Sequence, residues 1–595
     1  MANSLDDEEP LHADVKKRKR TSLTDGQKAT ASLLVFLLFE RIAFYAITFN
    51  MSTFATSCLG FKPAEATIIV TCTVGTAYLI APLFGWLSDR KFGYFNVLAT
   101  AAIFYIVASC FVCAAAFDTA LVFSNVTDPS VILNTIGRPR AFYLVGLGMM
   151  VPCVSAIRAN LVPFMLEQLG NGAEKRRVMD KFVSVCYFVI NVGATLSNVL
   201  AFGLQGQRGP GKKAEANTGF FWMYLSAPVC LLAALIILFT WRKRYRISRK
   251  RDFHYNLTLR SILSTACGCY KETYPNSDDV EKRRADGYRR RLAVIVPVVG
   301  SLIAYNIVYG QTTSSFVDQA FHLELYSEKA FKNVTVNSIV GCGHNKSTVV
   351  VNHPHYVVPP SAISFFDTVT IVLFVPAVWW IVYPIYERVA GKEFSMMNRI
   401  FWGMIFAMIS VLSAMSVELA RRLSSADIRY AYVCTKFADT SRLLIVSYSS
   451  ISLAAQIPQY VFVGAAEVLS GIAFQEFLLS RAPREFRCTV YSLYYTLIGN
   501  GYYLGTALSF AASELYFKSD GNGNGKPYRV KELKPSDIKT WAYFLIIFVF
   551  MALSCLFFHH VKKKHRDVPL VEPMSVERKR SYGSDSIKSS NSTRV

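Results

Sequence analysis

The apolar residues of this chain are gathered into a series of long blocks, and these blocks limit what the chain can fold into. A helix needs about 20 apolar residues to cross a hydrocarbon layer about 30 Å thick. Because no water is present there to satisfy the backbone, such blocks fold as helices. We therefore expect an all-α membrane protein of twelve transmembrane helices, near residues 29–53, 66–88, 95–117, 141–166, 181–204, 219–241, 292–316, 362–387, 399–419, 446–472, 488–513 and 538–560.

The spacing of these blocks predicts two six-helix halves joined by a basic linker. Six blocks, a long polar segment and six more blocks form the two-halves plan of many secondary transporters. The polar ends of the chain are typical of disordered tails. The expected organisation is a tail at 1–28, a first bundle at 29–241, a linker at 242–291, a second bundle at 292–560 with an outer loop at 317–361, and a tail at 561–595.

The formal net charge of +23 would suggest nucleic acid as a partner in a soluble protein. Here the basic clusters at 16–20, 174–177, 241–244 and 562–564 adjoin the ends of the expected spans. Lys and Arg gather on the cytoplasmic side of membrane proteins, so these clusters predict that both termini are cytoplasmic. We expect them to contact anionic lipid, and we expect no nucleic-acid partner.

Glycosylation signals agree with this topology. The sequons that begin at Asn125, Asn333 and Asn345 all fall in loops expected outside the membrane on the far side. The Cys residues show no metal-ligand spacing, and Cys342 with Cys434 could pair in the outer loops. A nucleotide-binding P-loop is absent from the sequence, so we do not expect ATP-driven transport, and we expect no cofactor.

Away from their ends, the expected spans contain five charged residues: Glu40 and Arg41 in the first, Arg158 in the fourth, Asp367 in the eighth and Glu467 in the tenth. A charge at mid-bilayer costs at least about 2.5–3.5 kcal/mol, so each requires a partner or a function. Cations in the first half and anions in the second suit a solute with a carboxylate at one end and an amine at the other. The alternative for Glu40 and Arg41 is that they neutralise each other and hold two helices together.

The segments around these charges resemble the signatures of the proton-dependent oligopeptide transporter (POT) family, a branch of the major facilitator type. Residues 37–45 are similar to the family's first-helix motif ExxERFxYY, and residues 186–194 to its fifth-helix motif FYxxINxGS. Residues 157–164, 309–323 and 456–484 resemble the peptide/histidine branch in the fourth, seventh and tenth helices. The resemblance covers nearly the whole chain and implies a transporter rather than an enzyme.

The resemblance also implies roles for individual side chains. Arg41 and Arg158 would hold the substrate carboxylate, and Glu467 would hold the amine. The remaining expected members of the site line its walls: Tyr45, Tyr78, Asn191, Gln311 and Asp367. A run of tyrosines in the eleventh span forms either side-chain pockets or ordinary packing, namely Tyr491, Tyr494, Tyr495, Tyr502 and Tyr503.

Proton coupling and gating are further implications of the resemblance. Glu40, Arg41 and Glu467 would couple proton movement to the substrate, while Asp89 and Arg90 would lock the inner ends of helices in the loop after the second span. The chain departs from the motif at Leu37, where the family has a Glu. It also has Arg rather than Lys at 158, and Arg does not lose its proton. Asp367 and His322 remain as further titrating candidates.

These features favour a symporter of histidine and di- or tripeptides that works by alternating access. Two alternatives stay open: an uncoupled carrier of another small organic solute or anion, and a solute-sensing membrane protein that recruits adaptors. The C-terminal residues 592–595 resemble a PDZ ligand and supply the motif for the sensing role. We expect a monomer in either the endosomal and lysosomal membrane or the plasma membrane.

Overall fold

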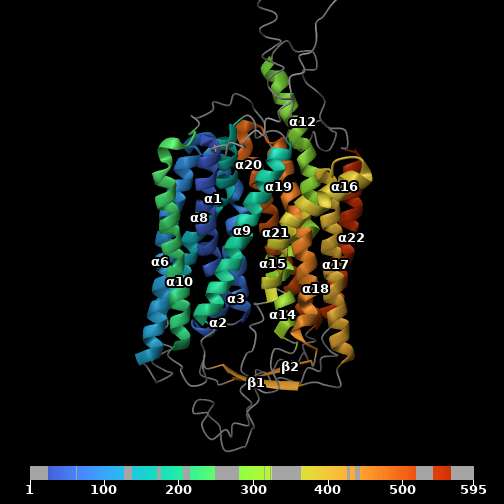
Figure 1. The fold of residues 1–595 in the computed structure, drawn as a ribbon. Coiled ribbons are helices and arrows are strands. Elements are labelled where there is room, and N and C mark those ends of the chain that lie inside the picture. The colour runs from blue at the N-terminus through green and yellow to red at the C-terminus, as the bar shows by residue number, and fades with distance from the viewer. Residues whose placement is uncertain are drawn as a thin grey trace, which may run out of the picture.

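The computed structural model is a bundle of helices that run roughly parallel to one another (Figure 1). It describes residues 24–61, 63–125, 137–170, 176–205, 215–247, 280–313, 315–321, 323, 363–424, 429–435, 442–449, 451–516 and 540–564. The predictions made for His322, Asn333, Asn345, Cys342 and the C-terminal four residues lie outside these residues. So do nearly all of the two tails and most of the linker and of the outer loop 317–361.

The first six expected spans correspond to helices on one side of the bundle. Capping fixes the start of the first helix, where the Thr24 hydroxyl accepts a hydrogen bond from the Gln27 amide at 3.3 Å and the Gln27 side chain accepts one from the Thr24 amide at 2.9 Å. The elements are α1 (Asp25–Thr48), α2 (Met51–Ser57), α3 (Pro63–Val70), η1 (Thr71–Gly75), α4 (Thr76–Leu79), α5 (Ala81–Leu87), η2 (Ser88–Phe92), α6 (Tyr94–Asn125), α8 (Gly137–Leu169), α9 (Arg176–Gln205), α10 (Glu215–Thr240) and η4 (Arg242–Arg244).

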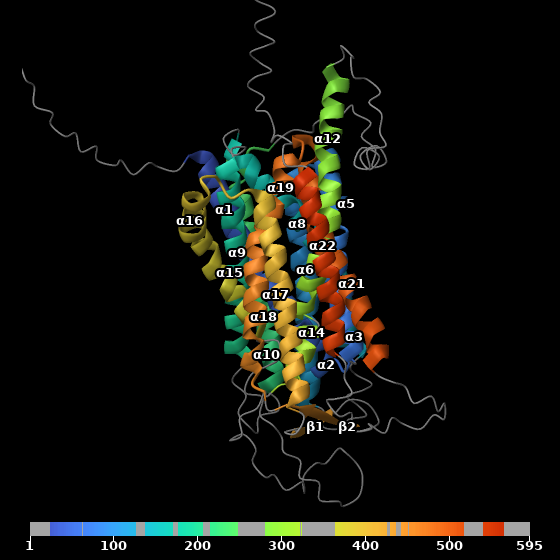
Figure 2. The ribbon, with the colours of Figure 1, turned by 90° about the vertical axis from the view of Figure 1, so that its right-hand side faces the viewer.

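The remaining elements form the other side of the bundle (Figures 1 and 2). They are α12 (Val280–Ser301), α13 (Ile303–Gly310), η5 (Gln311–Thr313), α14 (Ser315–Phe321), α15 (Phe365–Ala377), η8 (Val378–Val382), α16 (Tyr383–Ala390), α17 (Met396–Leu423), β1 (Arg429–Thr435), β2 (Arg442–Tyr448), η10 (Leu453–Gln456), α18 (Ile457–Ala466), η11 (Glu467–Gly471), α19 (Ile472–Arg481), η12 (Arg484–Phe486), α20 (Arg487–Tyr491), α21 (Leu493–Tyr516) and α22 (Thr540–Lys564).

Two ends of the bundle can be distinguished. At the end where α1 begins and α10 ends, here called the linker end, α12 projects beyond the other helices (Figure 1). At the opposite end, here called the hairpin end, β1 and β2 lie beyond the ends of the helices (Figures 1 and 2). The basic clusters predict that the linker end is cytoplasmic.

The expected all-α membrane fold is confirmed, with one antiparallel hairpin added outside the bundle. Within the described residues, ten helices are long and apolar enough to cross a membrane, or eleven if the bent pair Leu292–Ser301 and Ile303–Val317 is one span. The expected span at 488–513 is helical as α20 and α21 but does not meet these criteria. Its Tyr, Asn and Thr residues make it more polar than the others, so twelve spans remain a prediction.

The tenth span was placed wrongly. We expected residues 446–472, whereas the helical segment runs from Leu453 to Arg481. The apolar residues just before it belong to β2, which pairs with β1 from Arg429↔Tyr448 to Thr435↔Arg442. The helix also continues past 472 through Glu476, whose charge made the sequence look like the end of a span. That carboxylate is buried because it pairs with Arg399 of α17.

The halves touch on both sides of the bundle centre. Nearer the hairpin end, the Thr71 and Thr506 hydroxyls are 3.0 Å apart and the Thr76 and Tyr503 hydroxyls are 2.5 Å apart. One apolar core also crosses between halves, since Val468 and Tyr495 pack in the same cluster as the α1 and α8 side chains. The centre of the bundle is therefore enclosed in this conformation.

Gly193 allows α9 to approach α1 closely, and replacing it should loosen the first half. A Cβ at this position would lie 2.7 Å from Arg41 Cβ, so Gly193→Ala forces the two helices apart. We expect a loss of about 1–3 kcal/mol of stability, as is usual for overpacking. Thermal unfolding in detergent measures it, with Gly148→Ala as the control because nothing lies within 4 Å of a Cβ there. Equal melting temperatures for the two variants would contradict this account.

Candidate functional site

The two charges on α1 neutralise each other. Arg41 donates through Nε and Nη2 to the two carboxylate oxygens of Glu40, and neither residue is exposed. Arg41 Nη1 has no hydrogen-bond partner, and the guanidinium lies 4.7 Å from the centre of the Phe44 ring. A fork-to-fork pair of this kind is the strongest geometry for two buried charges. The positive charge of Arg41 is therefore neutralised within α1, while its Nη1 remains without a hydrogen-bond partner.

Arg158 of α8 has a different environment. Its guanidinium carbon lies 5.0 Å from the centre of the Phe44 ring, 5.4 Å from that of Tyr78 and 5.4 Å from that of Tyr495. Its Nη2 donates to the Tyr78 hydroxyl at 3.1 Å, and its Nε has no partner. Within the described residues it forms no ion pair. Aromatic faces stabilise a cation without neutralising it, so Arg158 keeps its charge available for an anion.

Glu467 of η11 lies at the interface between the halves. It accepts a hydrogen bond from the Tyr187 hydroxyl, which comes from α9 of the first half. It opens a π-helical turn that interrupts the tenth span, and such turns are frequent at functional sites. Within the described residues it forms no ion pair, so its negative charge, like the positive charge of Arg158, has no opposite charge beside it.

Two predicted neighbours lie close to this carboxylate. Asp367 of α15 lies within electrostatic reach of Glu467, and its Oδ1 is buried without a hydrogen-bond partner. Tyr45 of α1 stacks on Phe49 at 4.8 Å and lies within electrostatic reach of both Arg41 and Glu467. The structure thus brings together Arg41, Tyr45, Tyr78, Arg158, Asp367 and Glu467 in one central region.

Two other predicted residues make contacts that serve the packing of the helices. Gln311 accepts from Ser315 and from Tyr543 of α22, both at 2.7 Å, and donates to the Ile307 carbonyl at 2.9 Å. Asn191 donates to the Tyr187 carbonyl at 3.0 Å, one turn back in α9. These hydrogen bonds hold helix segments in place, and the binding roles expected for the two residues stay predictions.

The predicted gating pair contacts the other half at the linker end. The Asp89 carboxylate accepts from the Thr489 amide at 2.9 Å and the Thr489 hydroxyl at 2.7 Å, at the start of α20. Arg90 lies over the Phe486 ring, 5.6 Å from its centre. Both residues are therefore placed where an inner gate would close, and their gating role stays a prediction.

A second contact at the linker end was not foreseen from the sequence. Arg399 of α17 donates to Asp180 of α9 at 2.8 Å, to the Tyr383 hydroxyl at 2.7 Å and to Glu476 of α19. The Arg399 side chain is 2% exposed. Because Asp180 belongs to the first half and the others to the second, this cluster joins the halves. We call it the inner latch.

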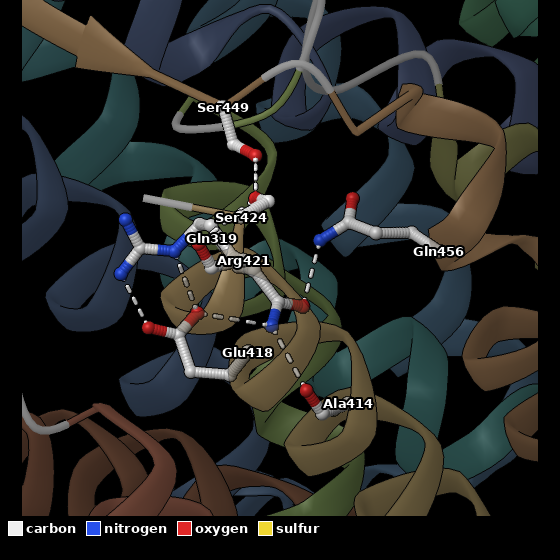
Figure 3. A network of polar contacts seen from close by, with 7 residues as sticks. All are labelled: Gln319, Ala414, Glu418, Arg421, Ser424, Ser449 and Gln456. Carbon is white, nitrogen blue, oxygen red and sulfur yellow. Dashed lines mark hydrogen bonds and ion pairs between the residues drawn. The ribbon is translucent and has the colours of Figure 1, made fainter. Parts of the chain in front are cut away.

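A buried polar network lies near the hairpin end of the second half (Figure 3). Gln319 of α14 accepts from Gln456 at 2.9 Å and donates to the Ala414 carbonyl at 2.9 Å and to Glu418 at 3.4 Å. Arg421 forms a two-pronged ion pair with Glu418 one turn along α17. The network joins α14, α17 and the start of the tenth span, so it fixes the second half internally.

Some residues of the centre were present in the sequence motifs without a stated role. Tyr187 belongs to the fifth-helix motif, and Tyr495 belongs to the tyrosine run whose role was left open. Phe44, which lies between the two arginines, is part of the first-helix motif. Their position within the motifs was the sign in the sequence that these residues belong to the site. Only the packing shows which rings surround Arg158.

Comparison with known proteins supports the motif assignment. A family model described as the POT family matches residues 346–523. Solute carrier family 15 member 3 from Mus musculus is 24% identical over 548 residues, covering 83% of this chain and 86% of that protein. Protein NRT1/PTR FAMILY 8.1 from Arabidopsis thaliana is 23% identical over 560 residues, covering 85% and 88%.

Solved structures share the fold. The POT family transporter PepTSo superposes with a TM-score of 0.59 at 15% identity, covering 91% of this chain and 98% of that one. An auto-inhibited POT family peptide transporter gives 0.57 at 16% identity, covering 92% and 98%. The motifs, the relatives and the shared fold agree on what the chain resembles: it is similar to transporters of the POT family, and many of its helices are long and apolar enough to cross a membrane.

Proposed function

We propose that the protein is a secondary transporter that carries small zwitterions, namely di- and tripeptides or histidine, between its two halves. The observation that carries this proposal is the pairing of one unneutralised cation with one unneutralised anion across the centre. Arg158 in the first half and Glu467 in the second each lie buried among aromatic rings, and neither forms an ion pair with any residue that the structure describes. A solute with a carboxylate and an amine would supply both missing charges.

The geometry gives Arg41 and Arg158 different roles in the site. Arg41 is already neutralised by Glu40, whereas Arg158 lies among three aromatic rings and forms no ion pair within the described residues. Arg158 therefore takes the substrate carboxylate, and Arg41 with Glu40 supports the site from α1. The Tyr494 and Tyr495 rings meet edge to face, with their centres 5.1 Å apart, and lie along α21 between the cation and the acidic side. These two rings would line the path of the substrate backbone.

Proton symport is part of the proposal. Leu37 is buried and apolar, so the first carboxylate of the family motif is missing. Glu467 and Asp367 remain within electrostatic reach of each other in the second half. A proton on either one relieves the repulsion between two nearby carboxylates, which makes the pair a suitable proton carrier. One carboxylate of the pair would then carry the proton while the other holds the substrate amine.

An uncoupled carrier of another solute is the second candidate. The relatives include proteins of the NRT1/PTR family, and an unneutralised Arg158 would also attract an anion that has no amine. Retention of Glu467 favours a solute with an amine. One solved structure with this fold, at a TM-score of 0.55 and 14% identity, is a complex with 5-aminolevulinic acid, which carries both groups.

Several further expectations belong to the same proposal. We propose glycosylation at Asn125, Asn333 and Asn345, contact of the basic clusters with anionic lipid, and a monomeric state. We also propose that a PDZ-domain protein binds the C-terminus. The protein would reside in the endosomal and lysosomal membrane or in the plasma membrane. Cell-surface labelling of the full chain, with and without residues 592–595, tests the PDZ-domain partner and the choice of membrane together.

The proposal predicts the behaviour of Glu467→Gln. In proteoliposomes, an inward proton gradient should accelerate uptake of labelled histidine or dialanine by the unsubstituted protein. In Glu467→Gln this acceleration should fall about tenfold or more, because the amide cannot carry the proton or pair with the amine. Asp25→Asn is the matched control, since Asp25 is exposed and its ion pair within the described residues is a weak one to Lys28 at 3.8 Å.

The two candidate functions give different results in the unsubstituted protein. Uptake that ignores the proton gradient would identify an uncoupled carrier and would overturn the symport part of the proposal. Failure to take up either zwitterion, with uptake of an anion that lacks an amine, would overturn the zwitterion itself.

A further inference from the structure

A fixed turn of the chain follows the sixth span. Residues 241–247, here called the linker turn, come directly after α10 and pack against the linker end of α1, α6 and α8. The Tyr245 side chain is 6% exposed, and its ring packs against Phe95 of α6 and Phe164 of α8. Its hydroxyl lies 2.9 Å from the Ser32 hydroxyl of α1. One buried side chain therefore anchors the linker turn to three helices.

The backbone of the linker turn is held as well. Gln168 of α8, which is 1% exposed, accepts from the Arg246 amide at 2.8 Å and donates to the Arg246 carbonyl at 3.3 Å. Gly170 follows the end of α8 with a φ of +70°, a conformation that favours glycine. A Cβ at Gly170 would lie 2.7 Å from Arg246 Nη1, so the guanidinium occupies the space that a side chain would fill. Arg246 is therefore fixed at its backbone and at its side chain.

Three cations of the linker turn are available to a ligand. Lys243, Arg244 and Arg246 are exposed, and none of them forms an ion pair with a residue that the structure describes. The Arg244 guanidinium lies over the Trp241 ring, 4.7 Å from its centre, and a ring orients a cation without neutralising it. The linker turn therefore presents positive charges in a defined arrangement.

The position of the linker turn indicates the kind of ligand. It begins where the sixth span ends, at the end of the bundle that the basic clusters predict to be cytoplasmic. The cytoplasmic leaflet carries anionic lipids, and a Trp such as Trp241 is typical of the level of their headgroups. Arg suits phosphate because its guanidinium can donate two parallel hydrogen bonds. This step rests on the proposed contact of the basic clusters with anionic lipid and specifies the lipid for one of them.

A headgroup with one negative charge would neutralise only one of the three cations, whereas a headgroup with several phosphates neutralises them together. Because the turn is fixed before binding, little conformational freedom is lost when it binds. We propose that the linker turn is a binding site for the headgroup of a polyphosphorylated inositol lipid, with Lys243, Arg244 and Arg246 as the phosphate ligands. Tyr245 and Gln168 are positioning residues that hold the turn in place.

The test measures binding of two short-chain lipids to the purified full chain. Dioctanoyl phosphatidylinositol bisphosphate carries several negative charges, whereas dioctanoyl phosphatidylserine carries a single net charge. Arg246→Gln should lower the affinity for the inositol lipid about fivefold, since one basic residue near an anionic surface contributes about 1 kcal/mol. The affinity for phosphatidylserine should change less, so the ratio of the two affinities falls. Lys563→Gln is the matched control and should leave the ratio unchanged, because Lys563 is an exposed cation in the last turn of α22.

A second variant separates the arrangement of the turn from its charge. Gln168→Leu keeps every cation but removes both hydrogen bonds to the Arg246 backbone, so the affinity ratio should fall as it does in Arg246→Gln. Gly170→Ala makes the same comparison if Gln168→Leu folds poorly, because the added methyl displaces the Arg246 guanidinium. Thermal unfolding of each variant shows whether the turn or the whole fold has changed.

The outcomes distinguish this site from general lipid contact. An affinity ratio that falls in none of the turn variants, or in Arg246→Gln alone, would overturn the site and leave the contact with anionic lipid intact. Soluble inositol trisphosphate that bound as tightly as the inositol lipid would overturn the lipid as the ligand. Failure of the unsubstituted protein to bind either lipid would overturn the proposed lipid contact and the site with it, while zwitterion transport is tested separately by uptake.

Discussion

Asp180→Asn is expected to shift the protein toward the state that is open at the linker end. Asp180 is the first-half member of the inner latch, and its contact with Arg399 is 2.8 Å in a site where the guanidinium is 2% exposed. A hydrogen bond between buried charged groups contributes about 1.5–3 kcal/mol. Its loss should change the equilibrium between closed and open forms on the order of 10- to 100-fold.

The latch allows a matched comparison. Glu476→Gln removes the other carboxylate that pairs with Arg399, but Glu476 and Arg399 both belong to the second half. Asp180→Asn should therefore loosen the contact between halves, while Glu476→Gln should weaken the second half itself. Hydrogen exchange of the amides at the start of α9 and of α20 measures the opening, and thermal unfolding measures the stability.

We expect faster exchange at both helix starts in Asp180→Asn, with little change in melting temperature. Glu476→Gln should show the reverse, with a lower melting temperature and less selective exchange. If the two variants behaved alike, Arg399 would be holding the second half together rather than closing the halves. In transport, a gating defect should lower the turnover rate more than it changes the apparent affinity for substrate.

The fold class and most span positions could be predicted from the sequence because they depend on local composition. Long apolar blocks identify membrane helices wherever they occur. The C-terminal end of the tenth span was misplaced because the sequence does not show that Glu476 is buried through Arg399, far away in the chain. The same limitation hid the pairing of β1 with β2, whose residues read as part of an apolar block.

The charged members of the site could also be found from sequence, since a charge within an apolar block is conspicuous. Their partners could not. Nothing local distinguishes Arg41, which is neutralised by its neighbour, from Arg158, which is held by three rings from α1, α4 and α21. The close approach of Gly193 to Arg41 likewise depends on how two helices pack. The sequence identifies the ionised side chains, whereas their packing decides which of them can still bind a charged group of the substrate.

Arg158→Met should abolish high-affinity binding of zwitterions without preventing folding. The side chain forms no ion pair within the described residues, so its removal leaves no buried carboxylate uncompensated. Losing a buried charged partner of a substrate carboxylate costs about 2–5 kcal/mol, which is roughly 30-fold or more in affinity. Substrate binding to the purified protein measures it. Arg242→Gln is the control, since Arg242 also lies over a ring, 5.4 Å from the centre of Phe95, but outside the centre.

Arg41→Met should behave in the opposite way, and the contrast separates the two arginines. Removing Arg41 leaves Glu40 fully buried without its partner, and breaking a buried pair from one side costs about 3–5 kcal/mol of stability. Arg41→Met should therefore lower the melting temperature and the yield of folded protein, whereas Arg158→Met should lower substrate affinity in a protein that melts normally. If Arg158→Met were the unstable variant and Arg41→Met the one that bound weakly, the carboxylate would belong to Arg41. Arg158 would then be a packing residue held by Phe44, Tyr78 and Tyr495.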